Sequence, residues 1–528
     1  MKQAILSVYD KTWIEVFAKW LVDLWRKLYS TWGTMRVLVE VNIPVTSVSD
    51  LTQFPEVLDG RVKTLHPHIY AGILAKRDKP AHMTELAEHN LWTIDMVVCN
   101  LYPFEETINQ EWVTLQEAQE QIDIGWVTLI RAASKNFQDV IMVSNPETYD
   151  LILWGLQSGD ISQEVRKWLA VQWFQHTAHY DTVISSYLAG DTHGFGVYLQ
   201  QMQPLRYGEN SHQSAIAYKE FGVENSLADM KILHGKALSF NNMVDIAGAV
   251  YSVSTLDDTG CAVIKHNNPC GLAQAKDMSK VLELAWEWDP ISAFGSIIAF
   301  NNPVDKDALS YLNLEDKATR KFVEVIIAPE FSEEALAYVT SRKNLRVIQY
   351  DPKTYKPTKD IKHFHGLWLV QDPDTQLHDG LSIMWKHSCD LDELTGLIEF
   401  GLKAVLCIKS NTIALVREVQ SWYQLLWMWA GQPNRIIARQ LAVEKARQNL
   451  ENEYEGDDLE SYIQEQLWKA VMISDAFFPF PDNVEMAADE WIKTIVQPGW
   501  SIKDSEVIAA ADELGICMIK SGLRHFYH

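Results

Sequence analysis

Alternating apolar and mixed segments run through residues 1–190. Apolar runs rich in β-branched residues occupy 4–8, 36–41, 95–99 and 139–144, a composition typical of buried strands. Between them, apolar residues recur at helical spacing, most clearly from Trp13 to Leu28, and 146–190 has a helical pattern. Strands separated by helices predict βαβ units and a mostly parallel sheet, so the expected fold class is α/β.

A second α/β region follows a break in this pattern. The pattern lapses at 189–205 through Gly190, Gly194, Gly196 and Pro204. Further strand-like runs occupy 261–265, 296–300 and 322–328, and a similar succession begins near 365. We therefore expect domains at 1–195 and 196–528, the second with subdomains at 196–364 and 365–528. The acidic segment 440–467 is interpreted as a helical, solvated surface insertion.

Composition and charge narrow the class of protein. The chain has 528 residues, of which 47% are hydrophobic and 22% charged, as in globular proteins. A formal net charge of −24 argues against a binder of nucleic acid or anionic membranes. No apolar run approaches the ~20 residues that span a bilayer. The chain opens on the apolar segment 4–8 without a charged leader, so a cytoplasmic protein is expected.

The six cysteines are scattered and include no Cys-x-x-Cys pair. Neither a disulfide framework nor a zinc site is therefore indicated.

Polar residues that follow apolar runs are the first candidates for chemistry, because ligands of open α/β sheets bind beyond strand ends. Tyr102 follows the run at 95–99 and offers a phenol. Lys265 and His266 end the run at 261–265 and are candidates for proton transfer, with a hydrogen-bonded structural histidine as the alternative. For Cys270, between Pro and Gly, a turn is favoured over a nucleophile.

Two segments of the first domain suit a phosphate. Residues 61–64 place Arg61, Lys63 and Thr64 together, and these side chains supply a donor fork, a charge and a hydroxyl. The segment 30–34 follows a predicted helix and precedes a predicted strand, where backbone N–H groups can form an anion nest.

Many short motifs occur in a fixed order along the chain. They include SVYDKT (7–12), STWGT (30–34), GRVKTLHP (60–67), NLYPF (100–104), RAASKN (131–136), LRYGENSHQ (205–213), IKHNNPCG (264–271), KSN (409–411), SDAFFPF (474–480), VQPG (496–499) and RHF (524–526). This set resembles the PurH family of bifunctional purine-biosynthesis enzymes over essentially the full length.

The resemblance implies fold and function together. It implies a methylglyoxal-synthase-like domain that closes FAICAR to IMP with loss of water. Two cytidine-deaminase-like subdomains would transfer a formyl group from 10-formyltetrahydrofolate to AICAR. It further implies a homodimer with a shared transferase site and no catalytic metal, and no deaminase-type His/Cys/Cys zinc set is evident here.

The resemblance also assigns site residues. For cyclisation, Lys135 matches the proton-transfer residue, with Lys63, Tyr102 and Asp123 as companions. The IMP or FAICAR site would comprise Asp10, Lys11, Ser30, Thr31, Gly33, Thr34, Arg61, Val62, Lys63, Thr64, Cys99, Asn100, Asp123 and Ile124.

For formyl transfer, His266 matches the proton acceptor, with Lys265 beside it, and Asn411 matches a residue that orients the amine or stabilises the oxyanion. The AICAR contacts would be Arg206, Tyr207, Asn242, Gly295, Glu324, Asn411, Arg435 and Arg524. The folate side would comprise Ile436, Phe477, Asp482, Ser501 and Ile502.

Trp replaces family glycines at several of these loops, namely at Trp13, Trp32, Trp126, Trp427, Trp429 and Trp500. A left-handed conformation at a non-Gly residue costs on the order of 1–2 kcal/mol. If Trp32 or Trp126 instead has a negative φ, its side chain would crowd the phosphate pocket. Two alternatives to an active two-step enzyme therefore remain. One is a PurH-fold dimer that binds nucleotide only weakly and in which cyclisation, or both activities, are impaired. The other is an unrelated zinc deaminase, which the missing metal ligands disfavour.

Overall fold

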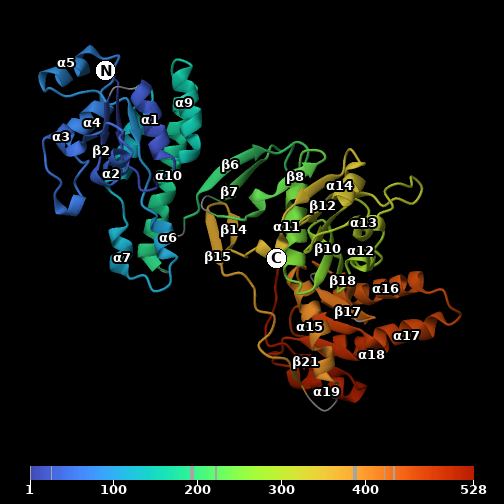
Figure 1. Cartoon of the computed structure of the whole chain (residues 1–528). Coiled ribbons are helices and arrows are strands. Elements are labelled where there is room, and N and C mark those ends of the chain that lie inside the picture. Colours follow the sequence, from blue (N-terminus) through green and yellow to red (C-terminus); the bar gives the residue numbers. More distant parts are fainter. Residues whose placement is uncertain are drawn as a thin grey trace. The chain divides into compact units, whose positions relative to one another are not determined.

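The computed structural model describes residues 2–24, 27–190, 196–220, 223–384, 389–420, 422–431 and 435–528, without the side chains of Asp59, Trp429, Arg435 and Ile436. It divides into two compact units, Met1–Gln200 and Gln201–His528 (Figure 1). The boundary predicted at 195/196 adjoins residues outside the described ranges, and the subdivision at 364/365 stays a prediction. No helix within the described ranges is long and apolar enough to cross a membrane.

The first unit is built on a five-stranded parallel sheet in the order β3-β2-β1-β4-β5. Its strands are β1 (Gln3–Leu6), β2 (Lys27–Ser30), β3 (Thr46–Ser47), β4 (Met96–Val98) and β5 (Ile141–Val143). The helices are α1 (Ile14–Leu24), α2 (Trp32–Glu40), α3 (Val48–Thr52), α4 (Pro67–Leu74), α5 (Pro80–Glu88), α6 (Phe104–Ile108), α7 (Leu115–Glu120), α8 (Gly125–Lys135), α9 (Tyr149–Gln157) and α10 (Gln163–Ala189). The predicted parallel α/β sheet is confirmed.

The second unit contains one sheet of twelve strands, in the order β16-β21-β20-β19-β17-β18-β10-β9-β11-β12-β13-β8. The strands are β8 (Lys231–His234), β9 (Thr259–Lys265), β10 (Asn268–Ala275), β11 (Ser296–Phe300), β12 (Val323–Ala328), β13 (Arg346–Gln349), β16 (Ser382–Ile383), β17 (Ile413–Val419), β18 (Trp422–Trp429), β19 (Val471–Ser474), β20 (Thr494–Gln497) and β21 (Cys517–Lys520). Two separate hairpins join β6 (Leu199–Pro204) to β7 (Ile216–Glu220) and β14 (Asp360–Phe364) to β15 (Leu367–Gln371).

The two halves of this sheet repeat one topology. In each half a hairpin (β9–β10 or β17–β18) is followed by an antiparallel strand and two parallel ones, and the halves meet where β10 pairs antiparallel with β18. The antiparallel junction relates the halves by an approximate twofold axis. No short-period repeat marks this duplication, because only the pairing pattern is repeated.

Helices cover both faces of the sheet. Apolar residues of α11 (Phe240–Ser254) and α15 (Leu391–Leu406) pack on one face. On the other face, α12 (Met278–Trp286), α13 (Lys306–Ser310) and α14 (Glu333–Thr340) cover the first half. Helices α16 (Arg435–Glu453), α17 (Leu459–Lys469), α18 (Asp482–Asp489) and α19 (Asp504–Leu514) cover the second half. Strand β9 supplies both cores, since Ala262 and Ile264 face one and Cys261 and Val263 the other.

Several local predictions are wrong. Residues 36–40 belong to α2 rather than to a strand and Val41 follows its end, because Thr34 and Leu38 bury one helical face. The segment 30–34 accordingly follows strand β2 and opens a helix. The predicted helix from Trp13 to Leu28 ends at Leu24, Trp25 lies outside the described residues, and Leu28 belongs to β2.

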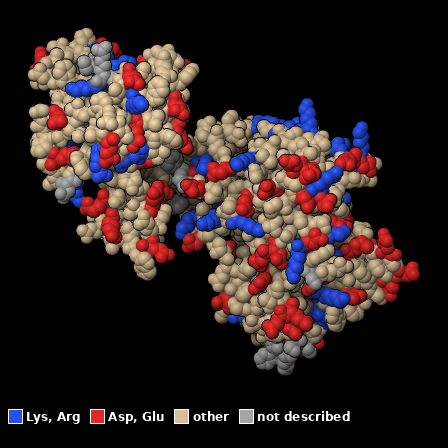
Figure 2. Space-filling view, viewed as in Figure 1, with Lys and Arg blue, Asp and Glu red and all other residues tan. Residues whose placement is uncertain are grey.

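The acidic segment 440–467 is helical as predicted, but it is no solvated excursion. Ala442, Val443, Ala446 and Leu450 of α16 are buried in the core over β17 and β18. The acidic side chains gather at the outer end of α16 and α17 (Figure 2). Only one side of the segment therefore faces water.

One cysteine pair departs from the expectation of unpaired thiols, since Cys389 and Cys517 form a disulfide. The other four cysteines are buried thiols. Cys270 lies inside β10 and donates to the carbonyl of Val263, so the turn precedes it at His266 and Asn267.

Candidate active sites

A pocket of about 520 Å³ lies at the carboxyl ends of the strands of the first unit. The strand order places the switch point between β1 and β4, where open parallel sheets bind ligands. Predicted residues that line this pocket are Arg61, Lys63, Thr64, Tyr102, Asp123 and Ile124. We call it the N-terminal pocket.

Asp123 is the strongest candidate for proton transfer in the N-terminal pocket. Its Oδ1 accepts the backbone N–H of Trp126 at 2.9 Å, and its buried Oδ2 has no hydrogen-bond partner. Burial raises the pKa of Asp123 to about 6, against the lowering effects of nearby N–H groups and Lys63. A carboxylate with such a pKa is suited to accept a proton near neutral pH.

Tyr102 lies beside this carboxylate. Burial, and then the charge of Asp123, raises the pKa of the Tyr102 phenol, which stays a proton donor. Its ring stacks on Trp126 with centroids 4.5 Å apart, and the Lys63 ammonium lies 5.7 Å from the Trp126 ring. Lys63, Tyr102 and Asp123 are thus brought together as the resemblance implies.

The remaining predicted residues of the first unit surround the adjoining strand ends. Asn100 Oδ1 accepts the backbone N–H groups of Tyr9 (2.6 Å) and Asp10 (3.1 Å), which ties the loop after β1 to the loop after β4. Thr31 and Thr34 bond to Ser7 and Val8. Cys99 is fully buried, and burial raises the pKa of its thiol, so it remains a neutral packing group. Lys11, Ser30, Gly33 and Val62 lie in these same loops and segments but do not line the pocket.

Lys135 is not brought to the N-terminal pocket. It is exposed at the last residue of α8, whereas Asp123 precedes the first residue. Eleven helical residues span roughly 16 Å at 1.5 Å per residue. The proton-transfer role implied for Lys135 stays a prediction.

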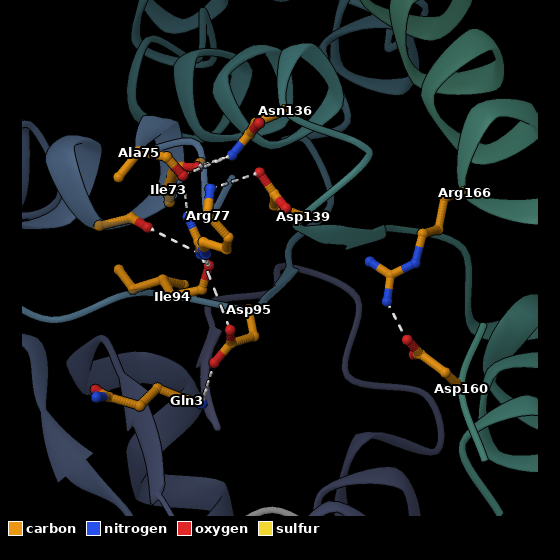
Figure 3. Close-up of polar contacts among 11 residues, drawn as sticks. Gln3, Ile73, Ala75, Arg77, Ile94, Asp95, Asn136, Asp139, Asp160 and Arg166 are labelled. Carbon is orange, nitrogen blue, oxygen red and sulfur yellow. Dashed lines mark hydrogen bonds and ion pairs between the residues drawn. The ribbon is translucent and has the colours of Figure 1, made fainter. Parts of the chain in front are cut away.

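The end of α8 that carries Lys135 is firmly anchored (Figure 3). The Asn136 Nδ2 donates to the carbonyls of Ile73 (2.8 Å) and Ala75 (3.2 Å). The backbone N–H of Arg77 donates to Asp139, and its guanidinium donates to the carbonyl of Ile94 at 2.8 Å. These bonds fix the α8 terminus against the segment after α4.

The sequence did not predict Glu120, which lines the pocket, or Ser7, which lies behind its wall and contacts Trp126. Glu120 holds the Arg61 guanidinium in a two-oxygen ion pair at the pocket wall, and no local sequence signal marks it. Ser7 accepts the indole N–H of Trp126 at 2.8 Å and bonds to Thr31, and its position after β1 is the signal that could have found it.

The tryptophans divide into two groups. Trp32 and Trp126 lie in the first turns of α2 and α8, so the left-handed strain considered for them does not arise. Trp126 is buried and does fill part of the pocket, whereas Trp32 is 64% exposed. Trp13 and Trp500 have φ values of 59° and 73°, where the strain applies. Trp427 is buried against Trp288, and the Trp429 side chain lies outside the described part.

The second unit collects its predicted residues at one edge of the twelve-stranded sheet, which we call the active edge. Strand β9 ends there at Lys265. Strands β11, β12 and β17 run in the opposite direction to β9, so they begin there. Strands β19, β20 and β21 also end at this edge. The residues placed there are Lys265, His266, Gly295, Glu324, Asn411, Phe477, Asp482, Ser501 and Ile502.

His266 lies in the two-residue loop of the β9–β10 hairpin and is exposed. Its neighbour Lys265 donates to the carbonyl of Phe294 at 2.6 Å, which fixes the loop before Gly295. Gly295 has a φ of 74°, and a Cβ there would lie 3.3 Å from Lys265 Nζ and from the Phe322 ring. Glycine is therefore required for this close approach.

A cluster of polar side chains lies farther along the active edge. The Nδ2 of Asn242, at the start of α11, donates to Glu324 Oε2 at 3.0 Å. Arg346 is buried and lies 3.4 Å from the same carboxylate. Burial lowers the pKa of Arg346, and Glu324, Arg206 and Tyr207 act on it electrostatically. The structure thus brings four predicted residues together. The structure also adds Arg346 to this cluster. The sequence feature that could have identified it is a charged residue at the start of a partly apolar strand.

The C-terminal tail returns along the active edge. The backbone N–H of His525 donates to the carbonyl of Asp475, and Ser410 N–H donates to the carbonyl of Tyr527 at 2.8 Å. This places Arg524 near the loop that carries Asn411. Arg435 and Ile436 open α16, which follows the end of β18 at the same edge, but their side chains lie outside the described part.

The described residues contain no group of three or more His, Cys, Asp or Glu side chains that could hold a metal ion.

Two family models match the chain in succession. The model described as an MGS-like domain matches residues 13–128, and that of the AICARFT/IMPCHase bienzyme matches residues 133–445. With the fold and both sites, these matches define a two-part α/β protein with an MGS-like first domain.

Known relatives agree over the whole length. Proteins named bifunctional purine biosynthesis protein PurH are 41% identical in Caldicellulosiruptor bescii and 43% identical in Chloroflexus aurantiacus. The matches cover 100% of this chain and 100% and 98% of those relatives, respectively. A solved structure titled "Crystal structure of ForH" is 33% identical, covers 35% of this chain and 97% of its own, and has a TM-score of 0.32. The chain belongs to the AICARFT/IMPCHase bienzyme family.

Proposed function

We propose that this protein catalyses the last two steps of IMP synthesis, formyl transfer to AICAR and cyclisation of the resulting FAICAR. The observation that carries the cyclisation is the N-terminal pocket, where Lys63, Tyr102 and a buried carboxylate with a raised pKa converge. Full-length similarity to PurH proteins favours the active enzyme over a weak nucleotide-binding dimer.

In cyclisation, the carboxamide nitrogen of FAICAR attacks its formyl carbon. Asp123 takes the proton from that nitrogen, and Lys63 stabilises the oxyanion that develops on the formyl oxygen. Tyr102 donates a hydrogen bond or a proton to this oxygen. The resulting hydroxyl then leaves as water with one further proton while the formylated nitrogen loses its own proton, and a double bond remains between that nitrogen and the former formyl carbon.

In formyl transfer, the amine of AICAR attacks the formyl carbon of 10-formyltetrahydrofolate. His266 takes the amine proton, the bond from that carbon to N10 of the folate breaks, and N10 receives a proton. Asn411 stabilises the tetrahedral oxyanion. The folate co-substrate lies along Ile436, Phe477, Asp482, Ser501 and Ile502, and no catalytic metal takes part.

The active enzyme is a homodimer with a shared transferase site. Strands β10 and β18 separate β9 from β17, so His266 and Asn411 lie roughly 14 Å apart along the edge at ~4.8 Å per strand. One amine cannot contact both residues at that distance. A second copy supplies Asn411 to the His266 of the first.

An exposed apolar surface supports the same dimer. In the β14–β15 hairpin, Phe364, Leu367, Trp368 and Leu369 are each more than half exposed. A two-stranded hairpin is only marginally stable in water, and exposed apolar patches of this kind mark interfaces. We also propose that the protein works in the cytoplasm on small molecules, without nucleic acid or membrane partners, and its net charge of −24 agrees with this.

The test is a coupled assay with AICAR and 10-formyltetrahydrofolate that follows tetrahydrofolate release and IMP formation separately. Both products should appear, tetrahydrofolate first. Supplied FAICAR should give IMP without folate. Folate release without IMP would refute cyclisation, and the absence of both products would refute the whole proposal.

A further inference from the structure

Asp245 of α11 contacts the turn that carries His266. One of its carboxylate oxygens, Oδ1, accepts the backbone N–H of Asn267 at 2.7 Å. Asp245 is partly buried, and it is the only acidic residue of α11. The carboxylate therefore joins a rigid helix to the loop that presents the proposed proton acceptor.

The turn needs such an attachment because of its conformation. His266 and Asn267 are the two loop residues of the β9–β10 hairpin, and Lys265 pairs with Asn268 across it. Their φ values are 52° and 59°, the pattern of a type I′ turn that favours Asn-Gly. Neither residue is glycine, so the conformation is intrinsically unfavourable and the surroundings must hold it.

Further contacts fix the same turn. The Asn267 side chain packs so closely on Gly248, one turn after Asp245, that a Cβ at Gly248 would collide with its Oδ1. Asn268 Nδ2 donates to the carbonyl of His266 at 3.0 Å. Burial raises the pKa of Asp245, whereas the Asn267 amide and the nearby His266 and Lys265 oppose that rise. Helix α11 thus contacts the turn at two positions, Asp245 and Gly248, that lie one helical turn apart.

We infer that Asp245 is a positioning residue for formyl transfer, which holds the His266–Asn267 turn so that the His266 imidazole meets the substrate amine. This inference rests on the proposed function. Asp245 itself contacts no reacting atom. Its loss should leave substrate binding largely intact, because Asp245 is not a predicted AICAR or folate contact and, of those contacts, only Asn242 shares its helix.

The experiment compares Asp245→Leu with Asp245→Asn, whose amide oxygen can still accept the Asn267 N–H. Asp245→Leu should lower kcat for formyl transfer about 10- to 100-fold with KM for AICAR within about threefold, since a displacement near 1 Å can have that effect. Asp245→Asn should recover most of the activity. Asp258→Ala, a change of an exposed carboxylate at the other end of β9, is the matched control and should change nothing.

Cyclisation of supplied FAICAR and the thermal midpoint serve as internal checks. Unchanged formyl transfer in Asp245→Leu, or an equal loss of cyclisation, would overturn the inference. Hydrogen exchange of the peptide around Asn267 should quicken in Asp245→Leu and stay slow in Asp245→Asn, and equal exchange in both would also overturn it. If the wild-type protein itself shows no formyl transfer, the proposed function is refuted instead. The comparison of hydrogen exchange in the two variants would still test whether Asp245 holds the turn.

Discussion

The indole of Trp126 lies flat against the phenol ring of Tyr102, with their planes only 21° apart. Its N–H donates to Ser7, at the end of β1, and its backbone N–H donates to Asp123. A residue at a family glycine position therefore contacts two proposed participants in cyclisation. It narrows the pocket and orders it at the same time.

Trp126→Gly should widen the N-terminal pocket. We expect KM for FAICAR to fall at least about threefold, because the ribose phosphate gains room beside the first turn of α8. Removal of a buried Trp should also destabilise the first unit by about 3–5 kcal/mol. Steady-state cyclisation kinetics and thermal unfolding measure the two effects. Trp32→Gly, at an exposed position, is the control, and an unchanged KM in Trp126→Gly would contradict the crowding.

Cyclisation should depend on the ionisation of Asp123. Because the reaction needs the carboxylate and the pKa of Asp123 is raised to about 6, kcat/KM should fall tenfold per pH unit below about pH 6. A rate profile from pH 4.5 to 9 checks this. A profile that stays flat down to pH 4.5 would show that another group accepts the proton.

Asp123→Asn should lose cyclisation yet gain stability. The folded-state pKa of about 6 lies above the usual value of 3.8 for an aspartate, so the stability from this group is present below pH 4 and is lost as pH rises through 6. The difference between a pKa of 3.8 and one of about 6 corresponds to about 3 kcal/mol. Urea unfolding at pH 8 should show the variant to be more stable by that order, and the difference should vanish near pH 4. Equal stability at both pH values would contradict the raised pKa.

His266→Ala should abolish formyl transfer and spare cyclisation of supplied FAICAR, because His266 and the N-terminal pocket belong to different units. The two assays on one preparation provide the measurement. An equal loss of both activities would refute the division of labour.

Trp368→Glu should break the proposed dimer. A charge on the exposed β15 strand cannot be buried without a partner, so the variant should elute as a monomer in size-exclusion chromatography with light scattering. It should lose formyl transfer, since the shared site needs two copies. Trp112→Glu, at a residue 92% exposed in the first unit, should remain dimeric. A monomeric Trp368→Glu with full formyl transfer would refute the shared site.

The sequence by itself determined the α/β class, because β-branched runs such as 296–300 bury both faces and need no distant partner to be recognised. It also located Lys63, Tyr102, Asp123 and His266 through motifs at strand ends. It failed at 36–41, where a β-branched run forms a helix because its neighbour β2 and the turn at Thr31 set its start.

The tertiary structure alone decided what these residues contact. The Arg61–Glu120 pair, the Trp126–Tyr102 stack and the Asp245–Asn267 hydrogen bond join segments far apart in the chain, and no local pattern encodes such distances. The order of the twelve strands likewise places Asn411 three strands from His266 at one edge. Local propensity specifies elements, whereas long-range packing decides which side chains meet, because the free energy of each contact depends on both partners at once.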